Sequence, residues 1–137
     1  MEIANPVKEY HSDSHSVYSC QYHIIFCPKY RRSVLVEDIA DRFKELLVEK
    51  QEEFGYGVVE LEVMPDHVHL LLDIPPKTSI YAVVGKIKGF TSHTLRQEFP
   101  KLKTRIPTLW TRSSFISSVG AVSLEVVKKY IENQKNK

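Results

Sequence analysis

The stretch VVELEVMPDHVHLLLDI, residues 58–74, carries the pattern that decides the fold. In its first half apolar and acidic side chains alternate, which is the period of a β-strand with one face buried. Pro65 and Asp66 interrupt the run, and both residue types are common in tight turns. The stretch therefore predicts a β-hairpin with strands over residues 58–64 and 67–74.

Two histidines share one face of the second strand. Residues two apart on a strand point the same way, so the Cα atoms of His67 and His69 lie side by side, about 6–7 Å apart. The apolar residues of this strand point to the opposite face: Val68, Leu70 and Leu72. A His-x-His pair indicates either a metal site or two ordinary histidines held by hydrogen bonds, and the spacing leaves both open.

The sequence around the hairpin supplies the other elements of a known arrangement. Strand patterns cover residues 17–27 and 113–119, amphipathic helices cover 37–55 and 78–99, and a last helix capped by Ser123 covers 124–134. The order β-α-β-β-α-β with an extra helix predicts an α+β, ferredoxin-like fold, as in RNA-recognition domains. Its four-stranded antiparallel sheet has two helices on one face, and the histidine face stays open unless another element covers it.

Length and composition indicate one domain. The chain has 137 residues, and we expect a loose polar lead-in over 1–16 followed by a single domain over 17–137. No apolar run approaches the roughly 18 residues that cross a bilayer, so we expect a cytoplasmic protein with no membrane partner. Cys20 and Cys27 lie roughly 23 Å apart on one predicted strand, which excludes a disulfide scaffold.

Charge is distributed unevenly along the chain. Residues 33–76 carry eleven acidic and three basic residues, whereas residues 77–112 carry eight basic residues and one acidic residue. This polarity predicts either a basic surface for a polyanion or simply the solvated faces of two helices. Within the basic part, Gly85 and Gly89 are four residues apart on one helix, which predicts a close approach by another backbone.

The last helix carries two polar groups on one face. Tyr130 and Gln134 are four residues apart, so they are neighbours on the helix surface. If this helix lies over the histidine face, two imidazoles, an amide oxygen and a phenol come together. The spacing is equally consistent with a half-buried tyrosine and a solvated glutamine.

Five segments together resemble a known family. They read YHIIFCPKYRR, MPDHVHLLL, KGFTSHTLRQEFP, LWTRSSFISSVG and LEVVKKYIENQ, in this order. In order and spacing they resemble the single-tyrosine HUH transposases of the insertion-sequence 200/605 type, over roughly residues 17–134. The resemblance implies that Tyr130 is the nucleophile and that His67, His69 and Gln134 bind a divalent ion, Mg²⁺ or Mn²⁺.

The resemblance also implies a reaction and its partners. Such an enzyme cleaves and rejoins single-stranded DNA at insertion-sequence ends through a covalent 5′-phosphotyrosine, and it recognises subterminal hairpins. It works as a homodimer, in which the tyrosine helix of one subunit can complete the histidine site of the other. Three other functions stay open: a domesticated repeat-associated tyrosine endonuclease, a metal-dependent phosphoesterase that uses water, and a non-catalytic RNA-recognition-like module.

Basic and aromatic residues are candidates for DNA contact, because phosphates attract Lys and Arg and bases stack on aromatic rings. The candidates are Lys29, Tyr30, Arg31, Arg32, Lys86, Lys88, Arg96, Trp110 and Arg112. Core or loop packing is the alternative for each of them. His23, on the mixed face of the first long strand, is expected to be a strand-face or DNA-contact residue rather than a metal ligand.

Overall fold

The computed structural model describes residues 11–12, 17–18, 20–119 and 124–136. A four-stranded antiparallel sheet lies at the centre, in the order β4-β5-β3-β6. Its strands are β3 (Gln21–Phe26), β4 (Gly57–Met64), β5 (His67–Asp73) and β6 (Phe115–Ser118). The predicted hairpin is confirmed, since β4 pairs with β5 across Pro65 and Asp66, with an irregularity between Val58 and Glu60.

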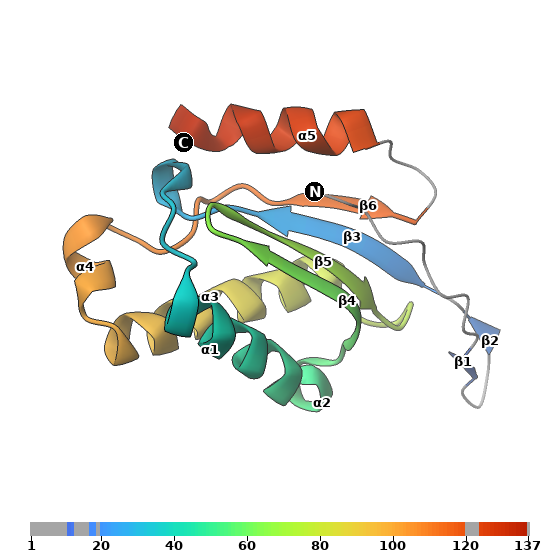
Figure 1. The fold of residues 1–137 in the computed structure, drawn as a ribbon. Helices are drawn as coiled ribbons and strands as arrows, with labels where there is room; N and C mark the ends of the chain where they lie inside the picture. Colours follow the sequence, from blue (N-terminus) through green and yellow to red (C-terminus); the bar gives the residue numbers. More distant parts are fainter. Residues whose placement is uncertain (1–10, 13–16, 19, 120–123, 137) are drawn as a thin grey trace.

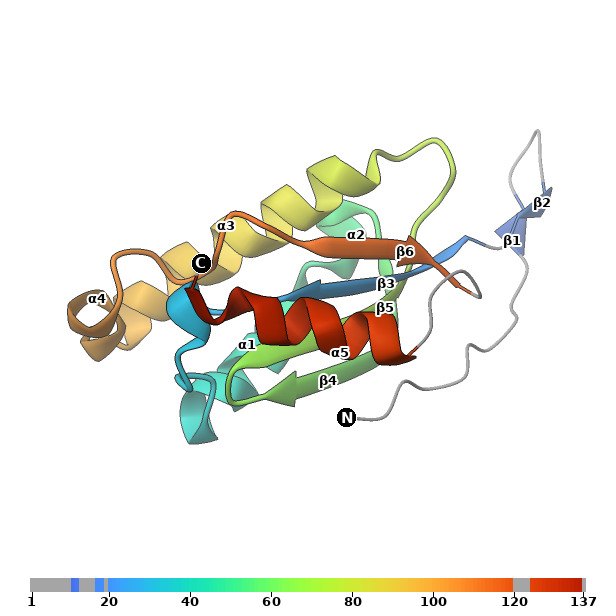
Figure 2. The ribbon, with the colours of Figure 1, turned by 90° about the horizontal axis from the view of Figure 1, so that it is seen from above.

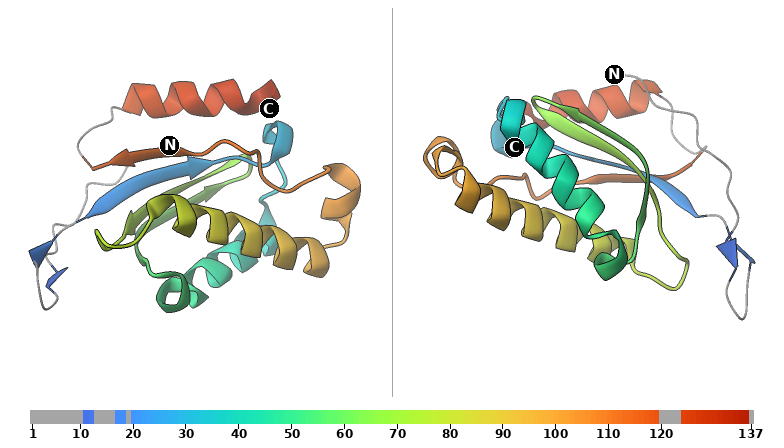
Figure 3. Two further views of the ribbon diagram at one scale, coloured as in Figure 1. Left: turned by 180° about the vertical axis from the view of Figure 1, so that it is seen from behind. Right: turned by 60° about the horizontal axis from the view of Figure 1, so that its bottom comes forward.

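Helices lie on both faces of this sheet. Three of them lie on one face: α1 (Glu37–Glu49), α2 (Gln51–Phe54) and α3 (Ile80–Glu98); α4 (Lys101–Arg105) follows α3 beyond the end of the sheet (Figure 1). The helix α5 (Leu124–Glu132), continued by the 3₁₀ turn η2 (Asn133–Asn136), crosses the opposite face (Figure 2). Figure 3 shows α1 and α3 beneath the sheet and α5 above it. The predicted α+β, ferredoxin-like fold is confirmed.

Local chemistry explains where the main helices begin and end. Glu37 and Asp38 occupy the first turn of α1, where carboxylates are favoured by the helix dipole. The Ser79 hydroxyl caps α3 by accepting a hydrogen bond from the Ala82 amide at 3.2 Å. Gly55 follows α2 with a φ of 80°, a left-handed conformation that suits glycine.

The core lies between the sheet and α1 and α3. Side chains of β3 and β5 that point this way are fully buried: Ile24, Phe26, Val68, Leu70 and Leu72. They pack against the buried faces of the two helices, at Phe43, Leu46, Leu47, Val83, Ile87 and Leu95. This confirms that Val68, Leu70 and Leu72 point away from the histidine face.

Several predicted boundaries were wrong. The strand expected over 17–27 is divided: β3 starts at Gln21, while β2 (Val17–Tyr18) pairs with β1 (His11–Ser12), within the segment expected to be loose. The helix expected over 37–55 is interrupted at Lys50, whose backbone is not helical. The basic segments 29–32 and 100–112, which were expected to be loops, contain the 3₁₀ turn η1 (Lys29–Arg31) and α4. The predicted cap Ser123 lies outside the described residues.

Other expectations about the chain can also be compared with the structure. Cys20 and Cys27 are both free, so no disulfide joins them. The close backbone approach expected at Gly85 and Gly89 is wrong, because a Cβ atom added at either would meet nothing within 4 Å. Among the described residues, no helix is both long and apolar enough to cross a membrane.

Candidate active site

The histidine face of the sheet is closed by α5. Across the strands His69 lies opposite Ile25, and Ile25 lies opposite Phe115. A small apolar cluster attaches the helix to this row: Ile25, Phe115, Val127, Tyr130 and Ile131. The side chains on this face are therefore buried, with His67 only 7% and His69 only 5% exposed.

His67 is held by the turn of the hairpin. Its Nδ1 lies 2.8 Å from Asp66 Oδ1, and Asp66 Oδ2 accepts a hydrogen bond from Arg31 Nε at 2.8 Å. Burial acts to raise the pKa of Asp66, but the hydrogen bond from His67 and the charge of Arg31 outweigh it and hold that pKa below its usual value. When Nδ1 of a neutral His67 donates to Asp66, its Nε2 carries the lone pair that a metal ion needs.

His69 is in contact with a third histidine that the sequence reading did not assign to the site. The Nε2 atom of His69 lies 3.1 Å from Nδ1 of His23, and the two rings are stacked with centroids 5.3 Å apart. Burial, together with the neighbouring histidines, lowers the pKa of His69 to about 4, and burial also lowers the pKa of His23. Both imidazoles are therefore neutral at pH 7, the form in which histidine binds metals.

Gln134 brings an amide oxygen without a partner. Its side chain is 2% exposed, and Nε2 donates to the Tyr130 carbonyl at 3.4 Å, while Oε1 accepts no hydrogen bond. An unpaired buried oxygen is costly, so this atom fits a position that a cation or a donor fills. Within the described part of the chain, no three His, Cys, Asp or Glu side chains form a metal-binding group. Two imidazoles and one amide oxygen nevertheless fit Mg²⁺ or Mn²⁺ completed by water and phosphate.

Tyr130 lies on α5, one turn before Gln134. Its hydroxyl is 2.9 Å from Ser113 Oγ, and its ring leans on Phe115 with centroids 5.3 Å apart. Burial raises the pKa of Tyr130, and the hydrogen bond with Ser113 opposes that rise. Arg31 Nη1 donates to the Ile131 carbonyl at 3.2 Å, which ties the end of α5 to η1. The tyrosine and glutamine therefore lie on one anchored helix over the histidine face (Figure 2).

Two of the predicted DNA contacts, Trp110 and Lys88, make hydrogen bonds within the chain. Trp110 is 6% exposed, packs edge-on against Phe26 and donates from Nε1 to Thr91 Oγ1 at 3.0 Å, so it is a core residue and not a surface for bases. The ammonium group of Lys88 donates to the carbonyls of Thr111, Arg112 and Ser113 and to Ser114 Oγ. Burial lowers the pKa of Lys88 to about 8, and its hydrogen bonds fix the loop before β6.

The other predicted DNA contacts divide into two groups. Arg31 and Arg96 make internal hydrogen bonds, the former to Asp66 and the latter to the Ile106 carbonyl at 3.1 Å. The rest lie wholly or partly at the surface: Lys29, Tyr30, Arg32, Lys86 and Arg112. Lys29 Nζ lies 5.2 Å from the centre of the Tyr30 ring, and Tyr30 is 46% exposed.

Comparisons with known proteins agree with this arrangement. A family model described as "Transposase IS200 like" matches residues 16–134. The ISDra2 transposase TnpA of Deinococcus radiodurans is 39% identical over 123 residues, which are 88% of this chain and 88% of that protein. The chain belongs to the IS200-like transposase family. Membership in this family makes it a DNA-processing enzyme.

Further relatives of this IS200-like transposase support the same assignment. The transposase for insertion sequence element IS200 of Salmonella typhimurium is 33% identical, over 88% of this chain and 80% of that protein. A crystal structure described as that of a transposase from Deinococcus radiodurans has a TM-score of 0.85 and 36% identity, covering 93% of this chain and 99% of the other. A REP-associated tyrosine transposase bound to a REP hairpin has a TM-score of 0.57 at 11% identity, covering 95% and 69%, so it shares the fold.

Proposed function

We propose that this chain cleaves and rejoins single-stranded DNA at the ends of an insertion sequence, in the cytoplasm, through a covalent bond between Tyr130 and a 5′ phosphate. One observation carries the proposal. Gln134 Oε1 is buried without a hydrogen-bond partner, one turn after Tyr130, where η2 continues the helix that covers His67 and His69. Family membership supports DNA as the substrate.

The chemistry is an exchange of one phosphodiester for another. The phenol oxygen of Tyr130 attacks phosphorus, the bond from phosphorus to the 3′ oxygen breaks, and the products are a 5′-phosphotyrosine and a free 3′-OH. The phenol loses its proton as the new bond forms, and the departing 3′ oxygen takes one up. A different 3′-OH can then attack the phosphotyrosine, which restores the phenol without an external energy source.

Residues of this chain prepare the phenol for that attack. Burial raises the pKa of Tyr130, so the hydroxyl is protonated at neutral pH and has to lose its proton during the attack. Ser113 Oγ holds the hydroxyl in one place, and Phe115 limits the rotation of the ring. These contacts orient the nucleophile before the reaction, and orientation of this kind accounts for a large part of enzymatic rate enhancement.

We also propose that His67, His69 and Gln134 hold a divalent ion, Mg²⁺ or Mn²⁺. The donor set supports it, because all three side chains are buried and Gln134 Oε1 has no other partner. Such an ion, when bound, supplies positive charge to the scissile phosphate. Asp66 then orients His67 through Nδ1, a carboxylate–histidine contact that is typical of metal-binding histidines.

The partners in this proposal are a hairpin-bearing single strand and a second copy of the chain. In the structure α5 packs on its own sheet, through Ile25, Val127 and Ile131. A mixture of two chains, one with Tyr130→Phe and the other with His67→Ala and His69→Ala, tests whether the tyrosine helix of one subunit completes the histidine site of the other. Cleavage returns in the mixture only if a dimer exchanges its tyrosine helices, and light scattering gives the mass of the assembly.

The decisive experiment for the proposal is a covalent adduct. Wild-type protein, incubated with Mn²⁺ and single-stranded ends of the source element, should yield a protein–DNA band on a denaturing gel. Tyr130→Phe removes only the phenol oxygen, so it should bind the same DNA and give no adduct. Cleavage by this variant at the wild-type rate would reject Tyr130 as the nucleophile.

A further inference from the structure

The side chain of Arg31 makes hydrogen bonds to two elements that are far apart in the chain. Its Nε donates to Asp66 Oδ2 at 2.8 Å, at the turn between β4 and β5, and its Nη1 donates to the Ile131 carbonyl at 3.2 Å, in α5. A guanidinium group is planar and rigid, so these two donors keep a fixed relative position. One side chain therefore holds α5 in place relative to the hairpin turn.

The carboxylate of Asp66 extends this contact to the candidate metal site. While Oδ2 accepts from Arg31, the other oxygen, Oδ1, lies 2.8 Å from His67 Nδ1. A carboxylate in contact with a metal-binding histidine fixes the orientation and the tautomer of its ring. The contacts from the Ile131 carbonyl through Arg31 and Asp66 to His67 form one continuous chain, here called the Arg31 bridge.

The backbone of η1 has an unusual conformation where it carries this arginine. Tyr30 and Arg31 have φ angles of 58° and 51°, in the left-handed region that is unfavourable for residues with a Cβ atom. Such conformations persist where surrounding contacts hold them, and they are frequent at functional sites. No residue of η1 is buried, so packing in the core does not account for this backbone, whereas the two contacts of Arg31 do.

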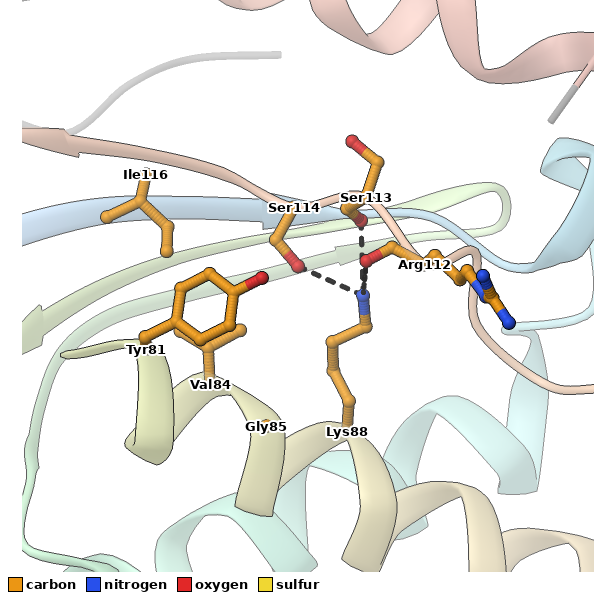
Figure 4. Close-up of a pocket in the computed structure, with 8 residues that line it drawn as sticks. All are labelled: Tyr81, Val84, Gly85, Lys88, Arg112, Ser113, Ser114 and Ile116. Carbon is orange, nitrogen blue, oxygen red and sulfur yellow. Dashed lines mark hydrogen bonds between the residues drawn. The ribbon is translucent and has the colours of Figure 1, made fainter. Parts of the chain in front are cut away.

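The helix α5 has a second polar anchor on the side of β6. Figure 4 shows the Ser113 hydroxyl directed away from the Lys88 ammonium group, and this hydroxyl lies 2.9 Å from the Tyr130 hydroxyl. The histidines lie two strands farther along the sheet, on β5. The Arg31 bridge holds the same helix at the end of the β4–β5 hairpin, directly beside a proposed metal ligand.

We propose that Arg31 is a positioning residue that couples the docking of α5 on the sheet to the metal affinity of His67. When α5 is docked, the Ile131 carbonyl orders the guanidinium, which in turn orders Asp66 and the ring of His67. When α5 leaves, Arg31 loses one partner, and Asp66 orients His67 less strictly. Such a coupling is reciprocal, so a bound ion also favours the docked helix. The inference rests on the proposed function, which makes His67 a metal ligand.

Removing the arginine should affect the ion and the helix together. We expect Arg31→Gln to lower Mn²⁺ affinity about tenfold in calorimetry, as for other partners of metal-binding histidines. In hydrogen exchange the amides of α5 should become faster, while those of α3 stay protected because Arg31 lies outside the main core. Arg32→Gln is the matched control, since it removes the same charge from the next, exposed position, and neither measurement should change.

A second set of variants tests the route through Asp66. A loosened helix also displaces Gln134, so these affinities are compared in Gln134→Ala protein, where the signal of free Mn²⁺ in electron paramagnetic resonance measures weak binding. Arg31→Gln should still lower the affinity in this background. Once Asp66→Ala is added, Arg31→Gln should lower it no further, because the route to His67 is already broken. Additive effects of the two changes would overturn the proposal.

Asp66→Ala also tests the coupling in the opposite direction. Asp66 belongs to the hairpin turn, yet its removal should speed the exchange of the α5 amides, because Arg31 loses a partner. If α5 exchanges as in wild type in both Arg31→Gln and Asp66→Ala, Arg31 does not hold the helix and the proposal is wrong.

The results separate this inference from the proposed function. If wild type binds Mn²⁺ and forms the DNA adduct, but Arg31→Gln behaves like Arg32→Gln, the proposed function stands and the role of Arg31 is rejected. If wild type binds no Mn²⁺, the proposed metal site fails, and the coupling fails with it.

Discussion

His23 is the residue of the candidate site that sequence reasoning did not assign to it. Its Nδ1 lies 3.1 Å from His69 Nε2, and a hydrogen bond between two neutral imidazoles needs one donor and one acceptor. Which of these two nitrogens carries the proton therefore determines which nitrogen of His69 has a lone pair free to bind an ion. Partners of this kind typically change metal affinity about 10- to 100-fold when they are removed.

We expect His23→Phe to lower Mn²⁺ affinity by about that factor, because the ring still fills the site while His69 loses its hydrogen bond. Isothermal titration calorimetry without DNA measures the affinity directly. Ser117→Ala is the control, since Ser117 lies opposite His23 on β6. Equal Mn²⁺ affinities for wild type and His23→Phe would show that His23 does not act on the metal site.

Removing a ligand should affect both the ion and the fold. His69 is 5% exposed under α5, so His69→Ala leaves His23 Nδ1 without its partner. We expect Mn²⁺ binding to disappear and the free energy of unfolding to fall by about 1–3 kcal/mol, the usual cost of an unpaired buried polar group. Calorimetry and urea denaturation measure the two effects. Unchanged Mn²⁺ binding would move the metal site elsewhere.

The same burial predicts a dependence of stability on pH in metal-free protein. The pKa of His69 is about 4 in the folded chain, against an ordinary value of about 6.5 in the unfolded chain. Between these values the unfolded state binds more protons, so stability should fall as the pH falls from about 6.5 to about 4. Urea denaturation at pH 7 and pH 5 should show a larger loss for wild type than for His69→Ala.

The residue scale also shows what the sequence could predict about the site. His67 and His69 are two residues apart on a strand, and Tyr130 and Gln134 are four residues apart on a helix. Residues with these spacings share one face, so both pairs could be found from the sequence directly. His23 is far from these residues in the chain and joins them only because β3 pairs with β5. The burial of Trp110 and Lys88 depends on tertiary packing that no local pattern reports.

At the scale of elements, the loop before β6 depends on one lysine of α3. Lys88 Nζ donates to three successive carbonyls, at 2.7 Å to Thr111, 3.4 Å to Arg112 and 3.1 Å to Ser113. This loop carries the Ser113 hydroxyl to Tyr130. A contact between α3 and the loop therefore determines the surroundings of the candidate nucleophile on the opposite face.

Lys88→Met should distinguish the hydrogen bonds that Lys88 makes to the loop from the effect of its positive charge alone. Methionine keeps much of the length of the side chain but removes the donor to three carbonyls, so we expect the free energy of unfolding to fall by about 1–3 kcal/mol. Lys86→Met removes an exposed charge two residues earlier and should change it by less than about 0.5 kcal/mol. Urea denaturation measures both, and equal effects would contradict the assignment of Lys88 to the loop.

The accuracy of the predicted elements follows from the strength of their patterns. The hairpin and α3 have clear periods and clear ends, at Pro65-Asp66 and at the Ser79 cap, so their positions were correct to within a few residues. The short strands β1 and β2 have two residues each, too few for a period to appear. The helix α4 lies in a segment that its basic residues had marked as a loop.

At the scale of the molecule, the sheet separates two layers that differ in how extensively they are packed. The face toward α1 and α3 holds the main core, whereas α5 is attached to the other face by a small cluster around Ile25, Val127 and Ile131. The candidate catalytic groups therefore lie in the less extensively packed layer. Such a layer can open locally without unfolding the whole domain.

Ile131→Asp should separate the two layers. Its charge cannot remain in the apolar cluster, so we expect α5 to leave the sheet while the core between the sheet and α1 and α3 stays folded. In hydrogen exchange the amides of α5 should become fast, and those of α3 should stay protected. DNA adduct formation should be lost with the helix. Leu70→Ala instead opens the main core and should cost about 2–5 kcal/mol of global stability, with faster exchange in both layers. If Ile131→Asp also made the amides of α3 exchange fast, α5 would be part of one cooperative unit with the core, and the separation of the two layers would be wrong.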